Sequence, residues 1–307
     1  MKLVTFSSKP EAANAHVRTL GSSVPADLLN CGVPTPGLLV SNEGGEDEVV
    51  SLSSLGYRSV RNIIEAGQGA LDEVQAKLAN APRFPLSRVT LHAPIPRPPR
   101  VFAVGLNYQK HADESKMAVQ KVPTVFLKLT SSIVGTDALI ILPKISKQPD
   151  YEAEFAVVIG KGGYQIAAED WKQHVFGYTI VNDVSARDIQ LATSQWTLGK
   201  SFPTFTPLGP TIVTADEVPD PHSLDISLTI NGETLQSSNT SDLIFKIPAL
   251  IAHISSLTPL EAGDIISTGT PEGVGLGRTP QRWLKPDEEV IVTISKLGQL
   301  RNRTIAE

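Results

Sequence analysis

Three acidic residues near the middle of the chain have the types and the spacing of a metal site. Glu152 and Glu154 lie in residues 150–159 and Asp183 ends residues 177–183, and both runs are rich in the β-branched and aromatic residues that predict strands. Because side chains alternate along a strand, the two glutamates project from one face. With a third carboxylate from a neighbouring strand, they predict an all-oxygen site for Mg²⁺ or another hard divalent ion. The alternative is that the glutamate pair faces water on an exposed sheet.

A histidine and a glutamate have the spacing of a proton-transfer pair. His111 and Glu114 follow a predicted strand and are three positions apart, so they share one face of a helical turn. A carboxylate beside a neutral histidine raises its basicity and fixes its tautomer, which suits the activation of a water or the movement of a substrate proton. The alternative is a polar helical turn that faces solvent.

Three basic residues lie in runs that can bring them close to the acids. Lys128 interrupts an apolar strand, Lys200 follows Gly199, and Arg187 follows Asp183 by four positions. The lysines can balance a carboxylate-rich pocket and hold an anionic substrate. Arg187 can grip a carboxylate of the substrate in a bidentate manner, or it can form an internal ion pair.

A Gly- and Thr-rich segment follows the predicted strand at residues 264–267. Its backbone N–H groups can cradle a carboxylate or a phosphate. Gly273 and Gly275 resemble part of a dinucleotide-binding motif, but Thr279-Pro280 follows where that motif needs a helix. We therefore expect no dinucleotide and no other organic cofactor.

Composition narrows the class of protein. The 307 residues include 41% hydrophobic and 19% charged residues, with a net charge of −5 and no basic block, which argues against nucleic-acid or membrane partners. The single cysteine, Cys31, excludes an internal disulfide. The first residues lack an apolar signal core, which favours the cytoplasm. A mitochondrial presequence is the alternative, because residues 2–20 contain Lys2, Lys9 and Arg18 against Glu11 alone.

The prolines at residues 94–99 predict a boundary between a small domain at residues 1–95 and a catalytic domain at residues 96–307. The first region shows one strand and two helical patterns, and the second shows many short strands and one helix at residues 247–256. This pattern predicts an α+β fold that is predominantly β, without regular β–α alternation. The expected strands of the second region span residues 101–105, 124–129, 139–142, 154–160, 177–182, 211–214, 224–230, 264–267 and 289–295.

Taken together and in order, these runs resemble the fumarylacetoacetate hydrolase family. The resemblance covers residues 100–307, and a weaker similarity extends over the N-terminal region. The looser match at residues 10–50 suggests an insertion. The runs that carry it are residues 105–108, 152–154, 182–188, 199–202 and 268–275.

The resemblance implies a mixed β-sandwich roll with a small N-terminal α+β domain, usually assembled as a homodimer. It implies one Mg²⁺ or Mn²⁺ per chain on the three acids, and a His111–Glu114 dyad on a lid at residues 108–122. Lys200 would neutralise enolate or carboxylate charge. Lys128, Arg187, Gln190, Gly269 and Thr270 complete the expected substrate contacts.

The expected chemistry is metal-stabilised enolate formation from a small 2-oxo or β-dicarbonyl acid. Some relatives that decarboxylate or cleave acylpyruvates carry arginine where this chain has Leu106. The loss of that arginine here favours the branch that acts on oxaloacetate, by tautomerisation or decarboxylation. C–C hydrolysis of acylpyruvates or fumarylacetoacetate-like acids is the main alternative, and a sugar-acid dehydratase or diketo-sugar-acid hydrolase is another. A metabolite-binding scaffold is the non-enzymatic alternative, and retention of the acids, His111 and Lys200 argues against it.

Overall fold

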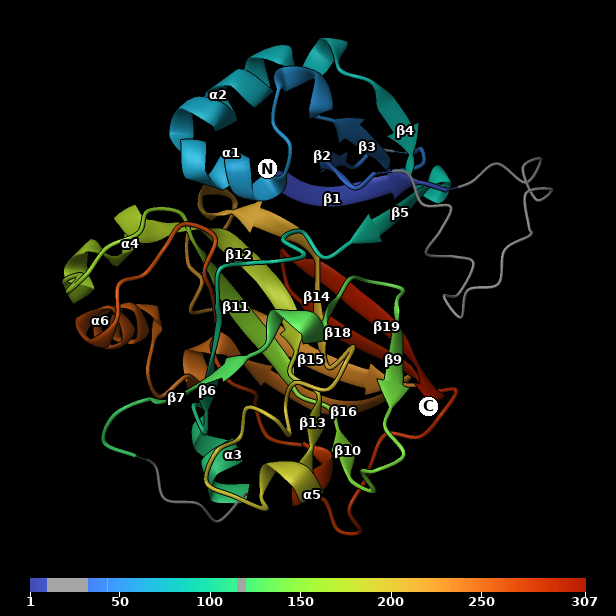
Figure 1. Ribbon diagram of the computed structural model, residues 1–307, viewed down its shortest axis with the longest axis vertical. Helices are drawn as coiled ribbons and strands as arrows, with labels where there is room; N and C mark the ends of the chain where they lie inside the picture. Colours follow the sequence, from blue (N-terminus) through green and yellow to red (C-terminus); the bar gives the residue numbers. More distant parts are fainter. Residues whose placement is uncertain (10–32, 43, 115–119) are drawn as a thin grey trace.

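Two β-sheets packed face to face form the body of the protein, and a smaller N-terminal region caps one end (Figure 1). The computed structural model describes residues 1–9, 33–42, 44–114 and 120–307. Residues 10–32 of the suggested insertion and residues 115–119 of the predicted lid lie outside the described residues. Within the described part, no helix has the length and apolar character needed to span a bilayer.

The larger sheet contains strands from both regions of the chain. Its strand order is β4-β3-β2-β1-β14-β12-β11-β17-β6-β7, with β5 paired to β1 and β8 paired to β14. The N-terminal strands are β1 (Lys2–Ser8), β2 (Thr35–Val40), β3 (Glu48–Ser51), β4 (Arg83–Pro85) and β5 (Val89–His92). The others are β6 (Val101–Gly105), β7 (Thr124–Lys128), β8 (Ile133–Val134), β11 (Ala153–Ile159), β12 (Val175–Asn182), β14 (Thr206–Thr214) and β17 (Ile265–Ser267). Antiparallel pairing of β1 with β14 joins the two regions.

Two helices cover the N-terminal strands, as the apolar periodicity predicts. They are α1 (Val60–Ala66) and α2 (Gln68–Lys77). The Ser59 side chain caps α1 by accepting a hydrogen bond from the Asn62 N–H at 3.2 Å. Val60, Ile63 and Ile64 are buried against Leu3 and other apolar residues of the sheet. This apolar cluster continues into the second region, because Val158, Phe176 and Ile212 belong to it as well.

The smaller sheet packs on the larger one and encloses the main core. Its order is β16 (Glu233–Asn239), β15 (Asp225–Ile230), β18 (Glu289–Ile294), β19 (Gly298–Ala306) and β9 (Leu139–Leu142). Phe155 of β11 and Tyr178 of β12 stack with their ring centroids 5.2 Å apart, and they share a buried cluster with Leu228 and Val292 of the smaller sheet. Helix α6 (Ile247–Leu257) adds Ile247, Leu250, Ile251 and Ile254 to this cluster. The predicted mixed, mostly β sandwich is confirmed.

All nine expected strands and the expected helix correspond to observed elements, with ends shifted by up to several residues. The turn at Asn231-Gly232 joins β15 to β16 with φ values of 50° and 83°, the backbone conformation that this dipeptide favours. Strands β2, β3, β4, β5, β8 and β19 have no counterpart among the predicted strands. The remaining elements are α3 (Gln109–Glu114), α4 (Trp171–His174), α5 (Arg187–Gln190), and the paired short strands β10 (Pro149–Asp150) and β13 (Ser185–Ala186).

Candidate active site

The three acids meet where β11 begins and β12 ends. The two strands pair antiparallel with Glu154 opposite Val181, and the Asp183 N–H donates to the Glu152 carbonyl at 2.9 Å. One carboxylate oxygen from each of Glu152, Glu154 and Asp183 lies within 4.8 Å of the others. All three residues are buried, with exposed fractions of 3%, 2% and 0%, so the exposed-sheet alternative is excluded.

The alternation of side chains along β11 explains this placement. Ala153, Phe155 and Val157 point into the core between the sheets, as the sequence predicts. Glu154 shares the opposite face with Ala156 and Val158, which belong to other apolar clusters. The strand therefore fixes the carboxylate with its own core packing, which leaves the acid little freedom to move.

Three buried cations surround the acids. Lys200 Nζ contacts Glu152 and lies 2.7 Å from Asp183 Oδ2. Lys128 Nζ contacts Asp183 and the Lys200 carbonyl. Arg187 is 2.6 Å from Glu152 through one terminal nitrogen. The structure therefore places both lysines beside the acids, and the internal ion pair is the arrangement that Arg187 adopts.

With every group ionised, this cluster would have an excess of one negative charge. Four buried carboxylates (those of Asp150, Glu152, Glu154 and Asp183) face three buried cations (those of Lys128, Arg187 and Lys200) in the described part of the chain. Burial opposes ionisation of Glu152, but Arg187 and Lys200 outweigh it and lower the pKa of this carboxyl far below its usual range. Burial raises the pKa of Glu154 well above its usual range, and the charges of Asp183 and Glu152 add to the effect. A divalent cation would relieve this repulsion, so the donor set fits a hard metal ion.

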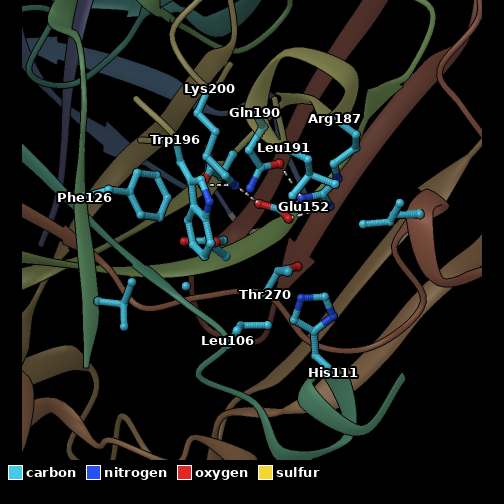
Figure 2. Close-up of a pocket in the computed structure, with 15 residues that line it drawn as sticks. Leu106, His111, Phe126, Glu152, Arg187, Gln190, Leu191, Trp196, Lys200 and Thr270 are labelled. Carbon is cyan, nitrogen blue, oxygen red and sulfur yellow. Dashed lines mark hydrogen bonds and ion pairs between the residues drawn. The ribbon is translucent and has the colours of Figure 1, made fainter. Parts of the chain in front are cut away.

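His111 and Glu114 lie on the short helix α3, and His111 faces the acids across the pocket (Figure 2). His111 Nδ1 is 3.7 Å from Glu114 Oε2, and the side chains are 8% and 22% exposed. The Gly273 N–H donates to Glu114 Oε2 at 3.0 Å. Burial alone would raise the pKa of the Glu114 carboxyl, but its contacts with His111 and Gly273 outweigh burial and lower that pKa below its usual value. The predicted proximity is confirmed, and the solvent-facing alternative is excluded for His111.

The pocket between these two sides has polar and apolar walls. Figure 2 shows Trp196, Phe126 and Leu106 beside the charged groups. Trp196 and Phe126 meet edge to face with centroids 5.5 Å apart. Gly105 makes room for the indole, because a Cβ at this position would lie 2.4 Å from a Trp196 ring atom. Leu106 has a positive φ of 55° and lines the pocket where the resemblance leads one to look for arginine.

Of the remaining predicted substrate contacts, some line the pocket, whereas others lie outside its lining and contact protein groups. Gln190 and Thr270 line the pocket. Arg187 donates to Gln190 Oε1 at 3.0 Å, which leaves the amide N–H₂ of Gln190 as its other polar end. Gly269 does not line this pocket, and its N–H donates to Glu154 Oε2 at 3.1 Å. Lys128 likewise contacts protein groups behind the acids.

The sequence and the fold agree on a family. Residues 100–305 match the family described as fumarylacetoacetate (FAA) hydrolase, C-terminal. The chain belongs to the fumarylacetoacetate hydrolase family. The mitochondrial oxaloacetate tautomerase Fahd2a of Rattus norvegicus is 45% identical over 274 residues, which cover 89% of this chain and 88% of that protein. The oxaloacetate tautomerase YisK of Bacillus subtilis is 45% identical over 224 residues, with coverages of 72% and 74%.

A solved structure of the family extends the likeness to the whole chain. The maleylpyruvate hydrolase of Sphingobium sp. SYK-6, solved in complex with manganese(II) and pyruvate, superposes with a TM-score of 0.79 at 28% identity. The match covers 100% of this chain and 99% of that one. The N-terminal region therefore belongs to the shared architecture as well.

Several pocket residues of this family member escaped prediction from sequence. Phe126, Leu191, Trp196 and Leu276 line the pocket. Trp196 precedes Lys200 by four positions, but in this run the sequence predicted a site role for the lysine alone. Asp150 begins the run that contains both glutamates, and its burial gives it a place in the ion-pair network.

Proposed function

We propose that this chain is a divalent-metal-dependent oxaloacetate tautomerase, which interconverts the keto and enol forms of its substrate. The observation that carries the proposal is the buried acid cluster opposite His111, in a chain 45% identical over 89% of its length to a protein with that name. Decarboxylation and C–C hydrolysis share the enolate with tautomerisation, and the three reactions differ in the step that follows enolate formation.

Glu152, Glu154 and Asp183 would hold one Mg²⁺ or Mn²⁺ per chain. The excess negative charge of the buried cluster supports a cation here, and the manganese in the maleylpyruvate hydrolase structure supports the choice of ion. When bound, such an ion supplies Lewis-acid stabilisation of an enolate oxygen. Although burial alone would lower it, Asp183 and Glu152 raise the pKa of Lys200, so this ammonium group stays charged and adds to the stabilisation.

The other side of the pocket would handle the proton. Tautomerisation breaks one C–H bond between two carbonyl groups and forms one O–H bond on the enolate oxygen. We assign His111 as the base that accepts the carbon-bound proton and then, as the imidazolium, gives it to the enolate oxygen, and Glu114 as the group that orients the imidazole. Gln190 and Thr270 line the same pocket and would orient the substrate through hydrogen bonds, Gln190 from its amide N–H₂.

The apolar wall favours proton transfer over hydrolysis. C–C hydrolysis needs an activated water that attacks the substrate. Leu106 and Phe126 offer such a water no hydrogen-bond partner, and the Trp196 indole N–H, a donor only, cannot accept its proton. An apolar Leu106 also removes one grip that would help to drive carboxylate loss. Both features support tautomerisation as the outcome.

One assay with two readouts tests the proposal. Purified protein loaded with Mn²⁺ is given oxaloacetate, and the enol absorbance and pyruvate release are followed in the same sample. We expect fast equilibration of the enol without pyruvate above the metal-only control. Stoichiometric pyruvate release would replace tautomerisation by decarboxylation, and cleavage of acetylpyruvate under the same conditions would replace it by C–C hydrolysis.

We further propose a homodimer formed through the β-rich region after residue 100. Strand β7 lies at an edge of the large sheet, and Leu127 and Leu129 expose 42% and 43% of their surface there. An open apolar strand edge needs a partner or a cover. Light scattering at micromolar concentration should give twice the mass of the chain, and a monomeric mass would contradict the proposal.

For the compartment, we propose the cytoplasm, with the mitochondrion as the alternative. The lone cysteine supports a reducing compartment. The name of the rat relative supports the mitochondrion. Imaging of the tagged full-length chain decides between the two.

A further inference from the structure

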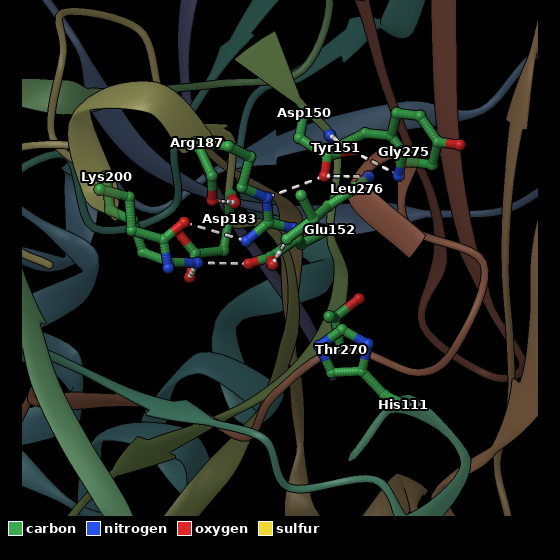
Figure 3. Close-up of polar contacts among 12 residues, drawn as sticks. His111, Asp150, Tyr151, Glu152, Asp183, Arg187, Lys200, Thr270, Gly275 and Leu276 are labelled. Carbon is green, nitrogen blue, oxygen red and sulfur yellow. Dashed lines mark hydrogen bonds and ion pairs between the residues drawn. The ribbon is translucent and has the colours of Figure 1, made fainter. Parts of the chain in front are cut away.

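Asp150 is fully buried and lies between Arg187 and the loop that contains Gly275 and Leu276 (Figure 3). Its Oδ1 accepts hydrogen bonds from the N–H groups of Tyr151 at 2.8 Å and Gly275 at 2.7 Å. Its Oδ2 accepts from the Leu276 N–H at 3.0 Å and from Arg187 Nε at 2.8 Å. Four donors converge on one carboxylate, which accounts for most of its acceptor capacity.

One of these contacts leads to the acid cluster. Arg187 donates from its Nε to Asp150, and this fixes the plane of the guanidinium group. A terminal nitrogen of the same group then meets Glu152 at 2.6 Å, and the other donates to Gln190 at 3.0 Å. Asp150 therefore determines where Arg187 holds Glu152. The Asp150 carboxylate also offsets part of the positive charge of Arg187, which would otherwise attract the Glu152 carboxylate more strongly.

The two loop contacts lead to the proton-handling side. The Gly275 and Leu276 N–H groups fix the loop that contains Gly273, whose own N–H holds Glu114. The loop is closely fitted to that carboxylate, because a Cβ at Gly277 would lie 2.3 Å from Glu114 Cδ. A displaced loop would therefore release Glu114, and with it the orientation of His111.

We propose that Asp150 is a positioning residue, a junction that sets the geometry of both sides of the pocket at once. In Asp150→Asn, the NH₂ group would replace one of the two oxygens. Either Arg187 and the Leu276 N–H, which share Oδ2, or the Tyr151 and Gly275 N–H groups, which share Oδ1, would then lose their acceptor. The acid side of this proposal rests on the proposed metal chemistry. The loop side does not, because it is measured by hydrogen exchange without metal or substrate.

The experiment compares Asp150→Asn with the wild-type full chain. Titration of metal-free protein with Mn²⁺ should show affinity lowered by about 10- to 100-fold, as is usual when a partner of a ligand is removed. Hydrogen exchange followed by mass spectrometry should show faster exchange in residues 273–277 and in α3. A loss of affinity with unchanged exchange in both segments would overturn the junction role, and so would faster exchange with unchanged affinity.

Two variants separate the arms of the junction. Glu114→Gln should speed exchange in α3 and leave Mn²⁺ affinity unchanged. Arg187→Lys keeps the charge but loses the Nε contact, so it should lower Mn²⁺ affinity and leave exchange in α3 unchanged, because Asp150 still holds the loop. If Asp150→Asn does not fold, these two variants decide, and the proposal fails if either one moves the readout assigned to the other.

Asp188→Asn is the matched control. Asp188 directly follows Arg187, and its carboxylate accepts from Ser146 Oγ and the Lys147 N–H, both at 2.7 Å. This variant removes the same charge from the same neighbourhood without touching the junction. We expect wild-type Mn²⁺ affinity and exchange. An effect equal to that of Asp150→Asn would show that lost negative charge alone explains both readouts, and would overturn the proposal.

If the proposed tautomerase activity fails while both readouts move as stated, only the reaction assignment is lost.

Discussion

The two sides of the pocket are built in different ways. The acid side stands on paired central strands, and its three carboxylates and three cations are almost completely buried. The proton-handling side stands on the six-residue helix α3, which is held to the 273–277 loop through Glu114. Deep packing suits groups that must keep one geometry, whereas a short helix with few buried residues can move as substrate enters. The comparison contrasts an acid cluster packed into central strands with a histidine held on a short helix through a loop contact of its neighbour Glu114.

Removal of a rigid carboxylate should have the largest effect. Glu154→Ala takes away one of three ligand groups, and we expect a loss of about 10³-fold or more in activity, because Lewis-acid stabilisation contributes several kcal/mol. Steady-state rates of oxaloacetate tautomerisation with Mn²⁺ measure this. Glu233→Ala, an exposed carboxylate on β16, is the control that should retain full activity.

Removal of the proton carrier should cost somewhat less. His111→Ala should lower kcat by about 10²-fold or more with little change in metal affinity. Since His111 and Glu114 act as one unit, the double variant with Glu114→Ala should lose little beyond His111→Ala alone. Fully additive losses in the double-mutant cycle would argue that the two residues work separately.

The sequence predicted the acid side more completely than the rest of the pocket. Strand β11 combines β-branched residues with an alternation that separates Glu154 from Phe155, so local pattern alone places the acid. Trp196 has no such pattern, because it reaches the pocket from a loop whose course depends on its contacts with Gly105 and Phe126. Asp150 lies in the same run as the glutamates, but the donors other than its neighbour's N–H come from segments distant in sequence.

Strand β19 shows why one element was missed. Its inward side chains include Asn302 and Thr304, which break the alternation of apolar and polar residues that reveals a strand. Asn302 is buried because its amide donates to the carbonyls of Gly135 and Ala138, both at 2.9 Å. The two partners are 167 and 164 positions away in the sequence, so no pattern of residues near Asn302 predicts these hydrogen bonds. The boundary at residue 95 stays a prediction, and the β1–β14 pairing shows that the sheet continues across it.

The apolar wall should tune selectivity more than rate. Trp196→Ala would enlarge the pocket beside Gly105, so activity on longer acylpyruvates relative to oxaloacetate should rise by about tenfold. Trp196→Phe keeps most of the wall and should change the ratio less. Measured kcat/KM values for the two substrates test this, and an unchanged ratio in Trp196→Ala would remove the indole from the determinants of specificity.

The smallest expected effect concerns stability. In metal-free protein, Glu154→Gln removes a carboxyl whose ionisation is opposed by burial, Asp183 and Glu152, and it keeps an oxygen that can accept from the Ser267 hydroxyl or the Gly269 N–H. We expect a rise in Tm of roughly 2 °C at neutral pH, equivalent to about 1 kcal/mol for a chain of this length. Thermal unfolding in the presence of a chelator measures it. A lower Tm would mean that the charged carboxylate stabilises the cluster even without an ion.

The most direct test of the two-sided account is a Mn²⁺ titration of metal-free protein followed by electron paramagnetic resonance. The wild type and His111→Ala should bind one ion per chain with affinities that agree within about a factor of two. Glu154→Ala should bind at least ~10-fold more weakly. Unchanged binding in Glu154→Ala, or equal losses in Glu154→Ala and His111→Ala, would contradict the assignment of the metal to the rigid side of the pocket.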